Sequence, residues 1–328
     1  MTDKPLPPWA DEIPQGAFIS YEPTYKVGEY FSRFHKDFFN FSPDEAAQFA
    51  QSGQNTPTTT EKHTNEESSV SHGTAAKCGM SYYYYDPTEH GFPKNRDYPV
   101  FVFMHGLSNA LEGDVCINYA GAEFYSKEEY QNAVRGAYLL VPIANEYRDE
   151  NGTVQNSWSD SYIKPVHHLI CEFQEKHAGG HISKKVMFGN SRGATMCFKM
   201  VDAYTDFFNA LIPIGTSDIS DDATLDRYDK NNVWLFYATG KRDEFNDYKT
   251  LIAPRIPRLE RMKHCFIFTP EWVYNGDHGI ASINFGVEMG QHCLINPMHC
   301  NLMFDDGTPM QQSLPNGVTG WLAQMLKA

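Results

Sequence analysis

One serine lies in a setting that could make it a nucleophile. Ser191 is the centre of the run G-N-S-R-G at residues 189–193, which fits the nucleophile-elbow pattern G-x-S-x-G. The apolar, β-prone run 186–188 precedes it, and residues 192–207 carry apolar side chains at helical spacing. A serine at a sharp turn between a strand and a helix exposes its hydroxyl, and the glycines let the two elements pack closely. An ordinary strand-to-helix turn is the alternative interpretation.

A serine hydroxyl needs a base that takes its proton, and the base needs a group that holds its tautomer. Side chains suited to these roles follow two later apolar runs. Asp243 comes after the run 233–238, and His278, in a G-D-H-G motif, comes after the run 265–269. The carboxyl ends of parallel strands converge on one edge of a sheet, so we expect Ser191, Asp243 and His278 to meet there.

Other residues could fill the roles of acid and base. They are Asp218 and Asp247 for the acid, and His292 and His299 for the base. Asp243 could instead be a surface residue of its polar loop. His278 follows the last predicted strand at the expected loop distance, whereas the other two histidines lie deeper in the C-terminal segment. The pairs His292-Cys293 and His299-Cys300 fit no standard zinc spacing, so we expect core packing there and no metal.

Composition narrows the class of protein. The 328 residues are 41% hydrophobic, which suffices for one large α/β domain with an appendage. The net charge of −14, with no evident basic patch, argues against a nucleic-acid or anionic-membrane partner. No apolar run approaches the roughly 20 residues that span a bilayer. The sequence says nothing of the oligomeric state.

The N-terminus and the cysteines indicate the compartment of the protein, and we expect a cytoplasmic protein. The start of the chain, residues 1–13, is polar and proline-rich, without the apolar core of a signal peptide. The seven cysteines lack the spacing of a disulfide framework, so reduced core thiols are expected. A secreted protein whose signal peptide had been removed would look the same.

From residue 80 onward, short apolar runs alternate with helical patterns. Strands are predicted at 81–85, 98–104, 137–142, 186–188, 210–214, 233–238 and 265–269. A helix with apolar residues on one face is predicted between 162 and 173. This order predicts an α/β fold with a mostly parallel, doubly wound sheet, entered through an antiparallel hairpin of the first two strands.

Residues 1–76 read as an N-terminal extension to a catalytic domain at 77–328. Ser42 to Glu45 has the serine, proline and glutamate of a helix start, which predicts a short helix through Phe49. Residues 51–76 are polar and predict a loop or linker. We expect the aromatic residues of this extension to pack on the main domain; they are Tyr25, Tyr30, Phe31, Phe34, Phe38, Phe39 and Phe41.

Together these features resemble the α/β-hydrolase superfamily over roughly residues 78–328. The resemblance rests on Y-P-V-F-V-F-M-H-G at 98–106, on the elbow, and on the order of Ser191, Asp243 and His278. The tyrosine-rich strand, the Y-P-x-x-x-x-x-H-G motif and Trp158 ahead of a helix resemble feruloyl-esterase and polyhydroxybutyrate-depolymerase-like esterases. The N-S-R of the elbow departs from the commoner x-S-M-G, and a serine followed by arginine also occurs in glucuronoyl esterases.

The resemblance implies a role for each position. Ser191 would attack an ester carbonyl, His278 would act as base and then as acid, and Asp243 would orient His278. The oxyanion hole would use the backbone N–H groups of Arg192 and Leu107. His105, just before Leu107, would shape that loop.

The implied activity is a serine-dependent carboxylic-ester hydrolase that works through an acyl-enzyme without a cofactor. Its substrate would be a small-molecule or saccharide ester, by analogy a hydroxycinnamoyl or acetyl ester of a plant-derived sugar. Trp158 and Trp272 lie in loops that would face the site, as substrate-binding walls or as core residues. The alternatives are a peptidase or acyltransferase with the same triad, and a catalytically silent binding module. Hydrolysis of a short p-nitrophenyl ester separates the silent protein from the enzymes, and a panel of feruloyl, acetyl and peptide substrates separates the rest.

Overall fold

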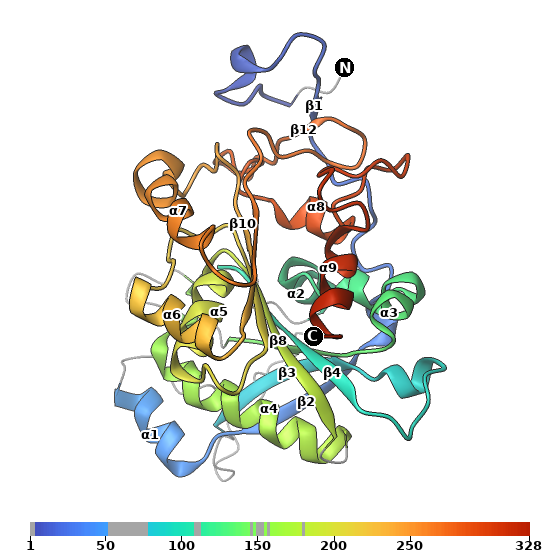
Figure 1. Ribbon diagram of the computed structural model, residues 1–328, viewed down its shortest axis with the longest axis vertical. Helices are drawn as coiled ribbons and strands as arrows, with labels where there is room; N and C mark the ends of the chain where they lie inside the picture. The colour runs from blue at the N-terminus through green and yellow to red at the C-terminus, as the bar shows by residue number, and fades with distance from the viewer. Residues whose placement is uncertain are drawn as a thin grey trace, which may run out of the picture.

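An eight-stranded sheet forms the centre of the protein (Figure 1). The computed structural model describes residues 4–51, 78–107, 113–144, 147–148, 154–155, 158–178 and 181–328. In spatial order the strands are β11 (Cys265–Phe268), β10 (Trp234–Ala238), β9 (Ala210–Ile214), β8 (Ile182–Asn190), β4 (Tyr98–Met104), β5 (Tyr138–Pro142), β3 (Gly79–Tyr85) and β2 (His35–Asn40). The six strands from β11 to β5 are parallel. The predicted mostly parallel sheet is therefore confirmed.

The entry into this sheet differs from the prediction. β3 pairs antiparallel with β5 and with β2, so β5 lies between β3 and β4. The two strands that were expected to form a hairpin are therefore not neighbours. The aromatic β3 is flanked by two strands, and its antiparallel partner at the edge comes from the N-terminal region.

Helices cover both faces of the sheet, as Figure 1 shows. One face carries α2 (Asp114–Ala120), α3 (Glu128–Val134), α8 (Ile295–His299) and α9 (Gly317–Met325). The other carries α1 (Pro43–Gln51), α4 (Ile163–His177), α5 (Arg192–Ala203), α6 (Asp222–Lys230) and α7 (Ile256–Leu259). β4 is buried along its whole length, with Phe101 and Phe103 on the first face and Val100 and Val102 on the second. A strand buried on both faces reads as a continuous apolar run, which is why it was visible in the sequence.

Shorter elements complete the described chain. Single turns of 3-10 helix lie at η1 (Ala10–Glu12), η2 (Phe31–Arg33), η3 (Pro87–His90), η4 (Glu123–Ser126), η5 (Asp160–Tyr162) and η7 (Ala253–Arg255), with a π-helical turn at η6 (Tyr248–Ile252). Two small sheets pair β1 (Ile19–Ser20) with β12 (Ile280–Ala281), and β6 (Tyr147–Arg148) with β7 (Val154–Gln155). Within the described part of the chain, no helix has the length and apolar character to cross a membrane.

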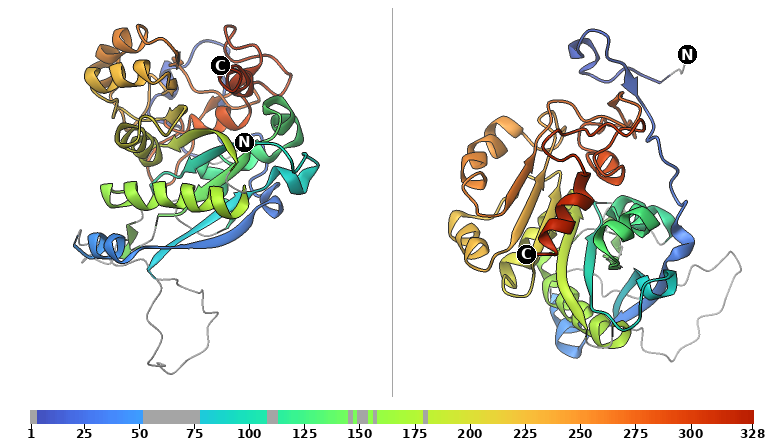
Figure 2. Two further views of the ribbon diagram at one scale, coloured as in Figure 1. Left: turned by 60° about the horizontal axis from the view of Figure 1, so that its bottom comes forward. Right: turned by 45° about the vertical axis from the view of Figure 1, so that its right-hand side comes forward.

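The N-terminal region is built into the main sheet. β2 pairs with β3 from His35 opposite Tyr84 to Asn40 opposite Gly79, so the sheet has strands on both sides of the boundary predicted at 76/77. Figure 2 shows this region running along one side of the molecule, with its first part, the N-terminal arm (residues 4–20), projecting beyond the main sheet. The predicted linker at 51–76 lies outside the described residues except for Gln51.

The aromatic rings of this region pack on the rest of the protein, as expected. The rings of Phe31 and Tyr83 lie 5.8 Å apart, and those of Phe49 and Tyr162 lie 4.7 Å apart. The predicted helix start is also present, because the Ser42 N–H donates to Glu45 Oε2 at 2.7 Å. Ring burial therefore holds β2 and α1 against the sheet.

Candidate active site

Ser191 occupies a strained turn between β8 and α5. β8 ends at Asn190 and α5 begins at Arg192, so the predicted strand, turn and helix are confirmed. The serine has φ 56° and ψ −116°, in a region that residues with a side chain rarely adopt. Its N–H donates to the Ile214 carbonyl at the end of the neighbouring β9, at 2.8 Å. This bond ties the turn to the carboxyl edge of the sheet.

The two glycines of the elbow are required by close backbone contacts. A Cβ on Gly189 would lie 2.2 Å from the Gly193 carbonyl oxygen. A Cβ on Gly193 would lie 2.0 Å from the Met104 carbonyl oxygen, at the end of β4. No side chain fits at either position without moving a strand. The G-x-S-x-G spacing therefore reports the approach of α5 to β8 and β4.

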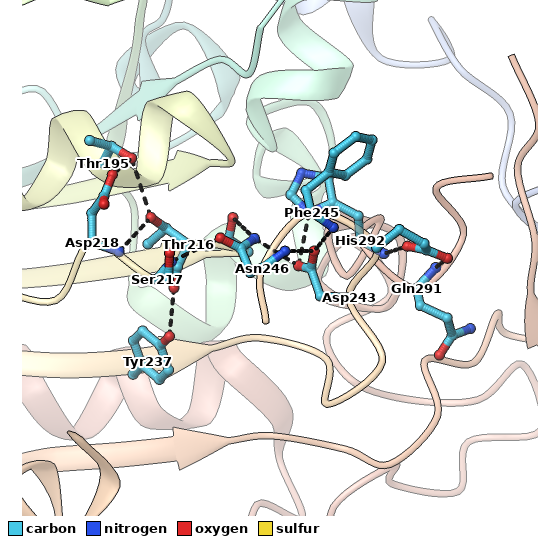
Figure 3. A network of polar contacts seen from close by, with 12 residues as sticks. Thr195, Thr216, Ser217, Asp218, Tyr237, Asp243, Phe245, Asn246, Gln291 and His292 are labelled. Carbon is cyan, nitrogen blue, oxygen red and sulfur yellow. Dashed lines mark hydrogen bonds and ion pairs between the residues drawn. The ribbon is translucent and has the colours of Figure 1, made fainter. Parts of the chain in front are cut away.

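The histidine that faces Asp243 is His292. Its Nδ1 lies 2.8 Å from Asp243 Oδ2 (Figure 3). Both side chains are buried. The other carboxylate oxygen accepts the N–H groups of Phe245 at 2.9 Å and Asn246 at 3.0 Å. The Asn246 Nδ2 donates to Oδ2 at 3.1 Å. With four hydrogen bonds the carboxylate has one orientation, and it requires the imidazole proton on Nδ1, which leaves Nε2 as an acceptor.

The imidazole of His292 lies beside the backbone that holds Ser191. A Cβ on Gly215 would lie 3.3 Å from His292 Cε1, so the ring packs against this glycine. Gly215 follows Ile214, whose carbonyl accepts the Ser191 N–H. Gly215 has φ 69°, and its N–H donates to the Ala238 carbonyl at the end of β10. The serine turn, the histidine ring and the loop that bears the acid thus meet at one edge of the sheet.

The prediction that His278 faces Asp243 is wrong. The His278 Nε2 lies 3.0 Å from Asp306 Oδ2, its ring stacks on Phe304 at 3.7 Å, and its side chain is 48% exposed. The reason is a detour of the chain after β11. Residues 280–281 form β12, which pairs with β1 in the N-terminal arm. The chain returns to Asp243 only at His292, which the sequence had offered as an alternative.

The remaining alternatives make other contacts. His299 Nε2 donates to the Asn118 carbonyl at 2.8 Å, and burial lowers the pKa of His299 to about 3. Asp218 accepts the Thr195 hydroxyl at 2.8 Å. Asp247 accepts the N–H groups of Lys249 and Thr250 at the start of η6. Asp243 is the carboxylate that holds the imidazole.

His105 shapes the loop that follows β4. Its Nε2 accepts the Ala144 N–H at 3.0 Å, so its proton lies on Nδ1 and is donated to the Gly106 carbonyl at 2.8 Å. Burial lowers the pKa of His105 to about 4, so the ring is neutral. These bonds fix the chain just before Leu107, which is half-exposed. The roles of the Leu107 and Arg192 N–H groups as oxyanion donors stay predictions, although Arg192 begins α5, where backbone N–H groups lack helical acceptors.

Both predicted substrate-binding tryptophans are covered by the protein itself. Trp158 is buried, and its Nε1 donates to the His105 carbonyl at 2.9 Å. Trp272 is buried against Trp9, with ring centres 5.3 Å apart, and under the guanidinium of Arg242 at 4.0 Å. We assign both to packing, which was the alternative interpretation.

Sequence reasoning missed Phe245. Its ring lies 4.9 Å from that of His292 in an edge-on arrangement, and it is 57% exposed. An exposed aromatic ring against the buried histidine offers an apolar surface at the site. Its place two residues after Asp243 was the signal, but neighbours in sequence do not reveal which ring faces the histidine.

The comparisons with known proteins show the fold. No protein-family model matches the sequence, and no curated protein matches it either. The solved structure of a thermostable esterase is similar over 82% of this chain and 60% of the esterase chain, with 16% identity and a TM-score of 0.53. A structure designated FAE is similar over 88% of this chain and 94% of its own, with 11% identity and a TM-score of 0.50. The chain has the α/β-hydrolase fold, as the resemblance in its sequence implied.

The low pKa of His105 predicts a loss of stability in acid. The unfolded chain takes up a proton at this histidine below about pH 6.5, whereas the folded protein does so only below about 4. The free energy of unfolding should therefore fall as the pH drops through this window, by about 3 kcal/mol from His105. Urea unfolding at pH 7 and pH 4.5 measures it. The free energy of unfolding should depend less on pH in His105→Asn, whereas the exposed His181→Asn should behave like the wild type. An equal pH dependence in all three proteins would contradict the low pKa of His105.

Proposed function

We propose that this protein is a serine-dependent carboxylic-ester hydrolase that acts through an acyl-enzyme. Ser191 is the nucleophile, His292 the general base and Asp243 the residue that orients the base. The observation that carries the proposal is the buried Asp243–His292 pair, whose ring packs on Gly215 beside the carbonyl that holds the strained Ser191 turn. The fold shared with a solved esterase is in keeping with it.

In the first half-reaction the Ser191 oxygen bonds to the ester carbonyl carbon, and His292 Nε2 takes the hydroxyl proton. The negative charge collects on the former carbonyl oxygen, where the N–H groups of Arg192 and Leu107 would stabilise it. When the C–O bond to the alcohol breaks, His292 gives its proton to the leaving alkoxide. Asp243 favours the charged imidazolium throughout, because its carboxylate is held facing Nδ1.

In the second half-reaction water replaces the alcohol. His292 takes a proton from the water as the oxygen attacks the acyl carbon, and then returns a proton to Ser191 as the acid leaves. No step uses a group outside the chain's own residues and water.

We extend the proposal to an ester with an aromatic or other apolar acyl group, such as a hydroxycinnamoyl ester of a sugar. The support is the exposed ring of Phe245 beside His292. Aromatic pairs contribute about 0.5–1.5 kcal/mol beyond the burial of their area. An acetyl ester would reach the same serine but would contact this ring less.

The role of Ser191 predicts the loss of both activity and covalent labelling in one variant. Ser191→Ala should reduce kcat/KM for a short p-nitrophenyl ester by at least about 10³-fold, because no nucleophile remains. A fluorophosphonate probe should label the wild type and fail to label this variant. Ser313→Ala, which removes an exposed hydroxyl elsewhere, is the control. A Ser191→Ala protein that is still labelled would disprove the assignment. A wild type that neither reacts with the probe nor hydrolyses any ester of the panel would point to the silent binding module.

The two histidines predict opposite outcomes. His292→Ala should lower kcat by about 10³-fold or more, since the proton of Ser191 then has no acceptor. His278→Ala should leave kcat within about twofold, because His278 pairs with Asp306 on the surface. Steady-state kinetics on the same ester measure both. The assignment of the base fails if the His278 variant is the inactive one.

Phe245 predicts a change in acyl preference. Phe245→Ala should raise KM for a feruloyl ester by about three- to tenfold and leave KM for the matching acetyl ester nearly unchanged, because only the aromatic acyl group loses a ring contact. Phe18→Ala removes another exposed ring and should change neither value. Equal effects of Phe245→Ala on the two esters would show that the ring does not read the acyl group.

A further inference from the structure

The residue after the acid holds the backbone of the histidine. Glu244 Oε2 accepts the N–H of His292 at 2.7 Å, and Oε1 accepts the N–H of Gln291 at 3.0 Å. One carboxylate thus bridges two consecutive peptide N–H groups. Residues 291–292 belong to no helix or strand, so these bonds replace the regular backbone partners that would otherwise fix the chain here.

The loop at residues 240–244, which bears Glu244, contacts residues 291–292 at two further points. Asp243 holds the imidazole of His292 from the side-chain end. A Cβ on Gly240 would lie 2.8 Å from the Gln291 carbonyl oxygen, so the glycine lets the two backbones touch. On the far side, the buried amide of Gln291 accepts the Val273 N–H at 2.8 Å and donates to the Ala281 carbonyl at 2.9 Å. The backbone that carries His292 therefore cannot shift unless the Glu244 contacts break.

We propose that Glu244 is a positioning residue that keeps the His292 imidazole on Asp243 and beside Ser191 by binding the two backbone N–H groups. The inference rests on the proposed function for its kinetic consequence. Glu244 touches neither the reacting atoms nor the substrate in this mechanism. Its effect passes through the position of His292, and misplacement by about 1 Å can cost about 10²-fold in rate.

The ionised carboxylate is the form that can accept both bonds. A protonated carboxyl, or an amide, would point a donor at one of the two N–H groups. Burial raises the pKa of Glu244. The hydrogen bonds from the Gln291 and His292 N–H groups act in the opposite direction, and the charge of Glu288 adds to the rise. The other titratable groups around it are Asp243, His292 and Cys293. Protonation of Glu244 should therefore loosen the His292 segment at a higher pH than an exposed glutamate would.

The test compares wild type with Glu244→Gln, which keeps the shape of the side chain but not both acceptors. The rate of fluorophosphonate labelling and kcat/KM for a p-nitrophenyl ester are measured from pH 5 to pH 8.5. We expect the variant to be about 10- to 100-fold slower at pH 8, mainly in kcat, and the ratio to shrink toward one as the pH falls. The ratio removes effects common to both proteins. A ratio near one throughout would overturn the proposal.

Two further variants guard the interpretation. Glu271→Gln makes the same chemical change at an exposed carboxylate that pairs with Arg242, and it should leave the rates unchanged. Glu244→Asp keeps the charge but is one methylene shorter, so it should reach one N–H group and lose less activity than Glu244→Gln. If Glu244→Gln does not fold, the Asp variant carries the test. Wild-type rates in the Asp variant would then overturn the proposal.

A readout independent of activity separates this inference from the proposed function. The Nδ1–H proton of His292, hydrogen-bonded to Asp243, should give a downfield resonance in NMR spectra of the wild type. We expect Glu244→Gln to shift or broaden it, and Glu271→Gln to leave it in place. If the protein hydrolysed no ester, a displaced resonance would still support the positioning role. An unchanged resonance would sink it even in an active enzyme.

Discussion

A buried carboxylate must have its oxygen atoms filled by donors, and the requirements of Asp243 organise the site around it. Two of its four hydrogen bonds come from the backbone of its own loop, at Phe245 and Asn246. The third comes from the Asn246 amide, which also donates to the Gly215 carbonyl and accepts the Ser217 N–H. The acid is thereby tied to the segment after β9. The fourth donor is the imidazole of His292, and the cost of leaving that place empty fixes the histidine in it.

A long detour of the chain separates the last strand of the sheet from this histidine. After β11 the chain leaves the sheet, forms β12 against β1, and returns at Gln291. The N-terminal arm covers the detour, because Trp9 packs on Trp272 and Glu12 pairs with Arg242, next to Asp243. The buried Gln291 amide then ties the return of the chain to residues 273 and 281. These contacts connect the N-terminal arm, the segment between β11 and Gln291, and the loop that bears Asp243 at the carboxyl edge of the sheet.

The elbow depends on a second constraint, the contact of backbones. α5 starts so close to β4 and β8 that neither Gly189 nor Gly193 has room for a Cβ. This packing places the loop after β4 beside the start of α5. Two hydrogen bonds hold the loop there: His105 accepts the Ala144 N–H, and Trp158 donates to the His105 carbonyl. Ser191 lies between the buried end of β8 and the buried face of α5. The packing of these two elements holds the serine in its strained conformation at φ 56°. N-terminal residues add the edge strand β2 to the same sheet.

The sequence by itself determined the features that arise from neighbours along the chain. The buried parallel strands, the glycines around Ser191, the helix start at Ser42 and the position of Asp243 just after β10 all leave local patterns, because burial, close contact and capping constrain residue types. No local pattern in the sequence indicates which histidine faces Asp243. His278 and His292 both follow β11, and the difference between them lies in the pairing of β12 with β1, some 260 residues away in the chain. The same holds for Trp158 and Trp272, whose burial depends on partners from distant segments, and for β5, which lies between β3 and β4. Only the tertiary structure decided these points, because long-range pairing depends on which surfaces meet after folding, and spacing along the chain does not record it.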